Sequence, residues 1–135
     1  MRVLIFFLGI AAMVLIPACS ESKVSDDEAV KKIVAELLNN CKSGDYDATF
    51  KQLSKLRKKD EKEFSYELDK NFIQGKCKKY NDKFGGGYDF VNFQNKDGYL
   101  EWEVFPRNGK ESSQIFSFVV EDREYKYSSD YALKK

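Results

Sequence analysis

The hydrophobic pattern of the chain changes its period once, near residue 84. Between residues 25 and 80, apolar side chains recur at the spacing of three and four residues that one buried helix face requires. From residue 84 onward they alternate with polar residues, as half-buried strands do. Helices followed by strands with hairpin-length connections predict an α+β fold, in which N-terminal helices pack on one face of an antiparallel β-meander.

Three helices are expected in the first half. Ser25 is a candidate N-cap with Glu28 three residues later, which is the capping-box pattern, and Gly44 ends this helix. Asp45 can cap a second helix, and a third is expected between Asp60 and Tyr80. The predicted buried positions are Val30, Ile33, Val34, Leu37, Leu38 and Cys41 in the first helix, Tyr46, Phe50, Leu53 and Leu56 in the second, and Phe64, Leu68 and Phe72 in the third.

Four strands are expected in the second half, over residues 88–94, 99–105 and 113–120 and within 121–131. Asp97-Gly98 and Asn108-Gly109 favour the positive φ of hairpin turns. In the second strand Leu100, Trp102 and Val104 share one face, so Glu101 and Glu103 should point away from the helices. The third strand is the most apolar and is expected inside the sheet. In the last strand Tyr125, Tyr127 and Tyr131 are expected in phase.

The N-terminus has the features of an export signal. Arg2 precedes an apolar run from Val3 to Ile16, which is too short for a span of about 20 residues and is closed by Pro17. The sequence "LIPACS" resembles the lipobox of bacterial lipoproteins, with small Ala18 before Cys19. The alternatives are an ordinary secretory signal and a retained membrane anchor.

The lipobox resemblance implies a domain organisation and a location. Residues 1–18 would be a lipoprotein signal peptide, residues 19–24 a lipidated N-terminus and tether, and residues 25–135 a single α+β domain. Acyl chains on Cys19 would anchor the protein to the lipid bilayer of the cell envelope. In a cell with two membranes, Ser20 resembles the default signal for sorting to the outer membrane, facing the periplasm.

Composition excludes several functions. The chain has no histidine, which removes Ser-His-Asp and Cys-His catalysis and imidazole metal sites. Loss of Arg2 with the signal leaves 22 basic residues against 22 acidic ones, so no net basic footprint for nucleic acid is expected. The basic clusters "KLRKKDEKE" and "KCKKYNDK" are interpreted as solvated helix faces; contact with anionic lipid head groups is the alternative.

A second resemblance covers the chain from "KSGDYDATFKQLS" to "FSFVVEDREYKYSS". With Gly44, Asp45 and Ala48, these segments resemble the small nuclear-transport-factor-two-like domains of bacterial lipoproteins. The family usually ends in a glycine and tryptophan pattern; here Tyr125 stands at the tryptophan position and the glycine is absent. The resemblance implies a curled meander around an apolar pocket. Some domains of this fold are enzymes, so the fold does not decide the function.

No catalytic, metal or cofactor motif is recognised. Isomerase-type relatives use a pocket carboxylate beside an acidic hydrogen-bond donor. The candidates here are Asp89, Glu101, Glu103, Tyr88 and Tyr99, but strand carboxylates beside apolar neighbours are expected to face solvent. A buried carboxylate next to a buried tyrosine hydroxyl would favour an enzyme.

Two cysteines remain after Cys19 takes its lipid. Cys41 and Cys77 are an even count in an exported, oxidising compartment, which favours a disulfide. Such a bridge would close a loop of about 37 residues and contribute up to about 4 kcal/mol in the chain-entropy model. Two buried free thiols are the alternative, and a redox pair lacks the usual CxxC spacing.

Aromatic residues concentrate in the strand region, where core packing explains most of them. A curled sheet also presents a concave apolar face, which is the usual place for a small ligand. The candidate ligand pocket comprises Trp102, Phe116, Phe118, Tyr125 and Tyr127. The sequence therefore favours a non-catalytic binding or assembly module for an envelope protein or small apolar ligand; an isomerase- or hydratase-like enzyme is the alternative.

Overall fold

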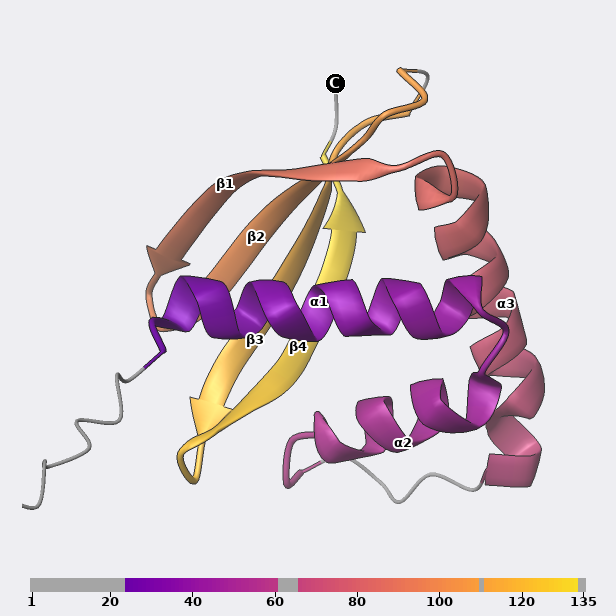
Figure 1. Cartoon of the computed structure of the whole chain (residues 1–135). Coiled ribbons are helices and arrows are strands. Elements are labelled where there is room, and N and C mark those ends of the chain that lie inside the picture. Colours follow the sequence, from indigo (N-terminus) through magenta and orange to yellow (C-terminus); the bar gives the residue numbers. More distant parts are fainter. Residues whose placement is uncertain (1–23, 61–65, 110, 134–135) are drawn as a thin grey trace, which may run out of the picture.

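The computed structural model describes residues 24–60, 66–109 and 111–133, with the side chains of residues 66–68 left out. Three helices come first: α1 (Asp26–Lys42), α2 (Tyr46–Lys55) and α3 (Tyr66–Phe84). Four strands follow: β1 (Tyr88–Lys96), β2 (Tyr99–Pro106), β3 (Gln114–Glu121) and β4 (Glu124–Ala132). The strands form one antiparallel sheet in the order β1-β2-β3-β4, so the predicted α+β meander is confirmed (Figure 1).

The ends of α1 and α2 follow their local sequence, with one exception. Gly44, at φ +73°, takes the left-handed conformation that ends α1. The carboxylate of Asp45 accepts from the amide of Ala48 at 3.0 Å, which caps α2 as predicted. Ser25 occupies the N-cap of α1 but makes no side-chain capping bond, so the predicted capping box is absent. Asp26 and Asp27 in the first turn suit the positive end of the helix.

The buried face of α3 differs from the prediction. The expected face held Phe64, Leu68 and Phe72, but Phe72 is 55% exposed, and the other two side chains lie outside the described residues. The side chains that enter the core have an equally regular helical spacing and are shifted by one residue: Ile73, Cys77, Tyr80 and Phe84. The helix also continues four residues beyond Tyr80, to Phe84.

Two irregularities shape the sheet. The pairing of β1 with β2 shifts between Phe90 and Asn92, so Val91 is an extra residue and is 51% exposed. The pairing of β3 with β4 shifts where Ser117 opposes Ser129 and Phe118 opposes Tyr127, which leaves Ser128 as the extra residue. Each extra residue reverses the side-chain alternation beyond it.

The prediction that Tyr125, Tyr127 and Tyr131 share one face of the last strand is wrong, because the bulge at Ser128 shifts the alternation. Tyr125 and Tyr127 lie on the face of the sheet that the helices cover, which is called the inner face. Tyr131 opposes Ile115 on the outer face and is 44% exposed. Asp130 takes the inner position, opposite Phe116. Because of this one extra serine, Asp130 and not Tyr131 lies on the inner face.

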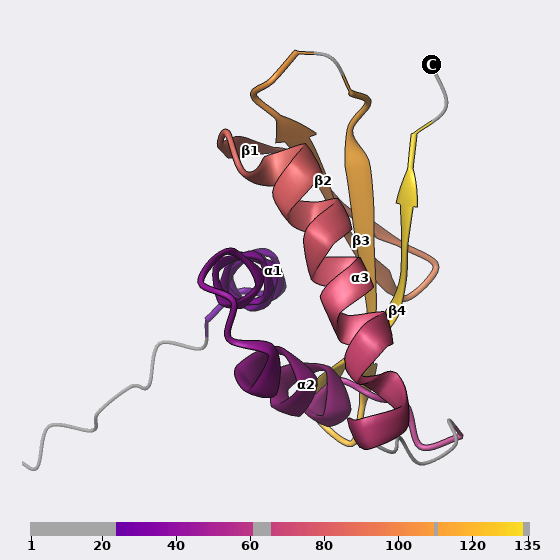
Figure 2. The same ribbon diagram turned by 90° about the vertical axis from the view of Figure 1, so that its right-hand side faces the viewer.

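The core lies between the inner face and the helices. Figures 1 and 2 show α1 crossing this face, with α3 beside it and α2 below. The indole nitrogen of Trp102 donates to the carbonyl of Asp27 at 2.7 Å, which ties α1 to β2. A disulfide joins Cys41 of α1 to Cys77 of α3, with a Cα–Cα distance of 4.8 Å. Both cysteines are buried.

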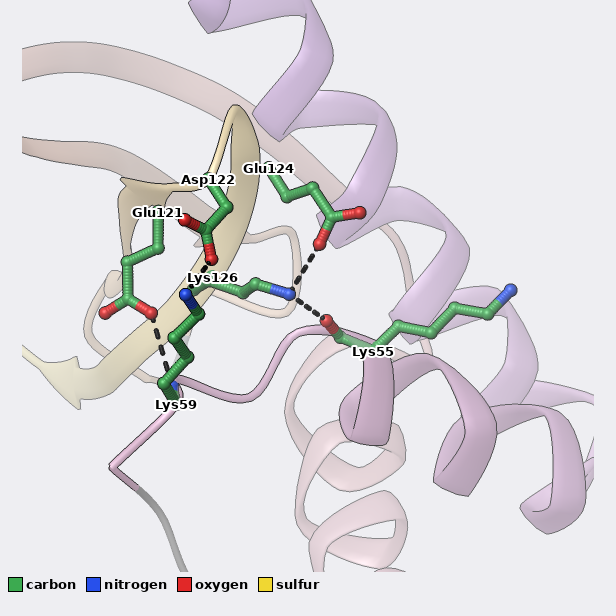
Figure 3. A network of polar contacts seen from close by, with 6 residues as sticks. All are labelled: Lys55, Lys59, Glu121, Asp122, Glu124 and Lys126. Carbon is green, nitrogen blue, oxygen red and sulfur yellow. Dashed lines mark hydrogen bonds and ion pairs between the residues drawn. The ribbon is translucent and has the colours of Figure 1, made fainter.

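A polar network joins the end of α2 to the β3–β4 hairpin (Figure 3). The ammonium of Lys126 donates to the carbonyl of Lys55 at 2.9 Å and to Glu124 at 2.8 Å. Lys59 contacts Asp122 at 2.5 Å through its ammonium and Glu121 at 3.3 Å through its backbone amide. The ion pair of Lys59 with Asp122 is exposed, so we assign it little stability.

None of the described helices is both long and apolar enough to cross a membrane.

Candidate functional site

Among the described residues, the carboxylate of Asp130 accepts the most hydrogen bonds. One oxygen, Oδ1, accepts from the ammonium of Lys76 at 3.1 Å and from the hydroxyl of Tyr127. The other, Oδ2, accepts from Tyr80 at 2.9 Å and from the amide of Gln114 at 2.6 Å. These five side chains, from α3, β3 and β4, are named the Asp130 cluster.

Local geometry brings the cluster together. The bulge at Ser128 places Tyr127 and Asp130 on the same face although they are three residues apart. On α3, Lys76 and Tyr80 are four residues apart and therefore neighbours on one side of the helix. Cys77, next to Lys76, holds this turn of α3 against α1 through the disulfide. The cluster therefore depends on both the strand register and the cross-link.

Burial and charge set the protonation states. Burial alone would raise the pKa of Asp130, but hydrogen bonds from Tyr127 and Tyr80 and the charge of Lys76 hold it below its usual value. Burial, with the negative charge of Asp130 as a second cause, raises the pKa of Tyr80 well above its ordinary value. The cluster consequently holds an ionised carboxylate and a neutral tyrosine at neutral pH.

This arrangement is poorly suited to proton abstraction. An ionised carboxylate has about four sites for hydrogen-bond donors, and four donors already contact Asp130. A general base needs a free lone pair within reach of the substrate proton and a pKa nearer neutrality. The geometry instead resembles a structural tie that fixes α3 against β4.

A cavity of about 670 Å³ adjoins the cluster. Its volume lies in the range of small-molecule sites. It runs along one side of α3 and is named the α3 groove; its lining residues are Phe72, Gly75, Lys76, Lys79, Tyr80, Asp82, Lys83, Glu111, Gln114 and Asp130. The cluster forms part of its wall, and charged side chains predominate among the rest.

The five aromatic residues of the predicted pocket share the inner face: three belong to the core, and Tyr125 and Tyr127 are partly buried and pack against it. Phe116 and Phe118 are fully buried, and Trp102 is 9% exposed. Trp102 contacts Phe90 and Phe93, each with ring centroids 5.3 Å apart, and Phe118 meets Tyr127 edge to face. None of the five lines the α3 groove. Tyr125 donates to Asp26 at 2.6 Å, which raises its pKa to about 12.

The predicted strand carboxylates lie outside the core. Glu101 and Glu103 occupy the outer face, as expected, and line a cavity of about 200 Å³ with Ile115, Tyr131 and other residues. Asp89 is exposed and binds Arg107 through both oxygens, at 3.0 and 2.7 Å, which lowers its pKa. Tyr99 is exposed; Tyr88 is half-buried, and burial raises its pKa.

Sequence reasoning missed the Asp130 cluster. Lys76 belongs to the segment "KCKKYNDK", which was interpreted as a solvated face, yet its side chain is only 18% exposed and pairs with Asp130. Of the other lysines of that segment, Lys78 and Lys79 are exposed as expected, and Lys83 is half-buried. The one available signal was the spacing of Lys76 and Tyr80 on a helix, because the bulge that brings Asp130 inward left no recognisable pattern.

The remaining sequence-derived sites stay as predictions. Cys19 and the signal peptide lie outside the described residues. Within the described part of the chain, no group of three or more carboxylates and cysteines is placed to hold a metal ion. No protein-family model matches the sequence, and the comparison with curated proteins finds no significant relative.

Proposed function

We propose that the protein is a membrane-anchored lipoprotein of the bacterial cell envelope whose domain is a non-catalytic binding or assembly module. The lipid anchor is inferred from "LIPACS", with Cys19 as the acylated residue. In a cell with two membranes, the expected location is the outer membrane, facing the periplasm. The sequence resemblance to the nuclear-transport-factor-two-like domains of bacterial lipoproteins agrees with this function.

The observation that supports a non-catalytic binding function is that hydrogen-bond donors already fill the acceptor sites of the Asp130 carboxylate. Its carboxylate is the one placed as the isomerase-type mechanism requires, because it is largely buried beside two tyrosine hydroxyls. Four donors occupy it, and the pKa of Asp130 is lowered, where a base would need it raised. The adjoining α3 groove offers volume for a ligand, and the buried carboxylate in its wall is already occupied by donors.

Lipidation is tested with the Cys19→Ala variant. Cells grown with an alkyne-tagged fatty acid should label the wild-type protein and not the variant, which should accumulate as unprocessed precursor. Label retained on Cys19→Ala would contradict the anchor. Crosslinking in native envelopes, followed by mass spectrometry, then tests the assembly function by asking whether a reproducible partner is captured.

An isomerase- or hydratase-like enzyme is the second candidate, and the same buried carboxylate favours it. The Asp130→Asn variant keeps the size of the side chain and removes its charge. Complementation of a deletion strain by this variant, at wild-type abundance in the membrane, supports a non-catalytic domain. Loss of complementation by a folded and membrane-bound Asp130→Asn protein, with Glu103→Gln still active, would favour the enzyme.

A further inference from the structure

Three lysines and three carboxylates line the α3 groove, and two of the lysines are left without an ion pair among the described residues. Lys76 is paired with Asp130 at 3.1 Å. Asp82 is paired with Lys78, on the same helix, at 2.9 Å. Two lysines of the lining, Lys79 and Lys83, make no ion pair within the described part of the chain. They are opposed by one lining carboxylate that is not engaged in such a pair, Glu111.

The two lysines are spaced to hold one anion. Residues four apart on a helix are neighbours, with about 6 Å of axial rise between them. Both side chains lie on the turns of α3 that border the groove, so their ammonium groups can reach the same carboxylate, sulfonate or phosphate. Charge-assisted hydrogen bonds from two ammonium groups are stronger than neutral ones.

Apolar surface lies further along the same side of the helix. Phe72 is 55% exposed and lines the groove two turns before Lys79. Gly75 lies between them, and a Cβ atom there would meet nothing within 4 Å, so the groove stays open at this point. Phe72 and Lys79 are about 10 Å apart along the helix axis. A ligand with an anionic end and an apolar body matches this sequence of surfaces.

The position of the groove favours a soluble ligand over a membrane lipid. In Figure 1, α1 begins at the left side of the domain, whereas α3 forms its right side. A tether that precedes α1 would bring the left side towards the bilayer. The α3 groove would then face away from the membrane surface.

We propose that the α3 groove binds a soluble organic anion with an apolar body, with the anionic group between Lys79 and Lys83 and the apolar body against Phe72. This inference rests on the proposed binding function and names its ligand class. Glu111 opposes the anion and limits its affinity. The Asp130 cluster forms the rigid wall of the groove and takes no part in chemistry.

The test compares two probes of the same shape that differ in charge. The full-length lipoprotein, in nanodiscs of phosphatidylcholine, is titrated by calorimetry with sodium 3-phenylpropionate and with neutral 3-phenylpropan-1-ol. The anion should bind about tenfold more tightly, the ratio that one charge-assisted hydrogen bond supplies. Equal dissociation constants for the two probes, or no binding of either, would overturn the proposal.

Variants locate the site. The double variant Lys79→Met/Lys83→Met should weaken the binding of phenylpropionate to the level of the alcohol. Glu111→Gln should strengthen it about threefold, because it relieves a screened repulsion. Lys51→Met, at an exposed position of α2, is the matched control and should leave both constants unchanged. An unchanged affinity in the double variant, with its melting temperature intact, would contradict the assignment.

A third experiment distinguishes a soluble anion from the anionic head group of a membrane lipid. Nanodiscs containing phosphatidylglycerol should leave the affinity for phenylpropionate unchanged if the groove faces away from the membrane. A loss of affinity that disappears in the double variant would instead assign the site to lipid head groups and overturn the soluble ligand. Failure of probe binding leaves the labelling of Cys19 and the capture of a partner unaffected, so it is distinguishable from failure of the proposed function.

Discussion

The two faces of the sheet place carboxylates in different environments. On the inner face, Asp130 accepts four hydrogen bonds and has a side chain that is 15% exposed. On the outer face, Glu101 and Glu103 border a smaller cavity of about 200 Å³, and the hydroxyl of Tyr131 lies 3.4 Å from Glu101. The inner carboxylate is part of the packing, whereas the outer pair remains at the surface.

The difference follows from strand register. Glu101 and Glu103 alternate regularly with buried Leu100, Trp102 and Val104, so they must point outward. Asp130 lies in a strand with an extra residue, which turns it inward. A carboxylate turned inward is tolerated only when donors replace its water. The comparison teaches that the position of a bulge, and not the residue type, decides which acid becomes structural.

The largest effect is expected in the inner core. Trp102→Ala removes an indole that packs on Phe90 and Phe93 and donates to the carbonyl of Asp27. The free energy of unfolding should fall by about 3 to 5 kcal/mol. Urea denaturation followed by circular dichroism measures this loss. A change below about 1 kcal/mol would mean that the ring lines an open pocket and is not core.

The next largest effect separates the two kinds of carboxylate directly. Asp130→Asn leaves Lys76 without its counter-charge and places an amide nitrogen among hydrogen-bond donors. The free energy of unfolding should fall by about 3 kcal/mol, as when one partner of a buried pair is removed. Thermal and urea unfolding measure the change, with Glu103→Gln as the matched control. Equal effects of the two variants would contradict the assignment of Asp130 as a structural tie.

At low pH, the free energy of unfolding should depend on the ionisation of Asp130. Its pKa in the folded protein is below its usual value of about 3.9, so its stabilising contribution is present above that value and is lost as the pH falls through the folded pKa. Between pH 5 and pH 2, wild-type stability should therefore fall more steeply than that of Asp130→Asn. Urea midpoints measured across this range provide the test. Parallel curves would show that the carboxylate is no more stabilised when folded than when unfolded.

The smallest effect is expected on the outer face. Glu101→Gln and Glu103→Gln remove charge from side chains at the surface of β2, with little loss of contact area. The free energy of unfolding should change by no more than about 0.5 kcal/mol. Differential scanning calorimetry of both variants provides the measurement. A loss above about 1 kcal/mol would show that the outer carboxylates are also structural.

The fold could be predicted because its signals are local. Asp45 caps its own helix, and Asp97 and Gly98 adopt positive φ in the turn between β1 and β2. The pairing of Cys41 with Cys77 was predicted from the even number of cysteines that is left if Cys19 carries the lipid, and the structure contains this disulfide. The alternation along β2 likewise determined which side of that strand is buried.

The site could not be predicted because its determinants are tertiary. In α3, the series through Phe72 and the series through Ile73 have the same helical spacing, so periodicity cannot choose between them. The disulfide at Cys77 and the contact of Tyr80 with Asp130 select the second series. The bulge at Ser128 depends on pairing with β3. Three adjacent polar residues, Ser128 to Asp130, show no preference for either face.

The bond between the end of α2 and β4 has a consequence for self-association. The amide of Tyr127 donates to the carbonyl of Leu56 at 2.6 Å, and the ammonium of Lys126 binds the carbonyl of Lys55. β4 is an edge strand, and an unpaired edge is a template onto which a strand of another molecule can add. Here the chain itself engages part of that edge, while the bulge at Ser128 interrupts its regularity. A strand arriving from a neighbouring molecule would first have to displace the end of α2 from this part of the edge, so these bonds oppose the addition of a foreign strand.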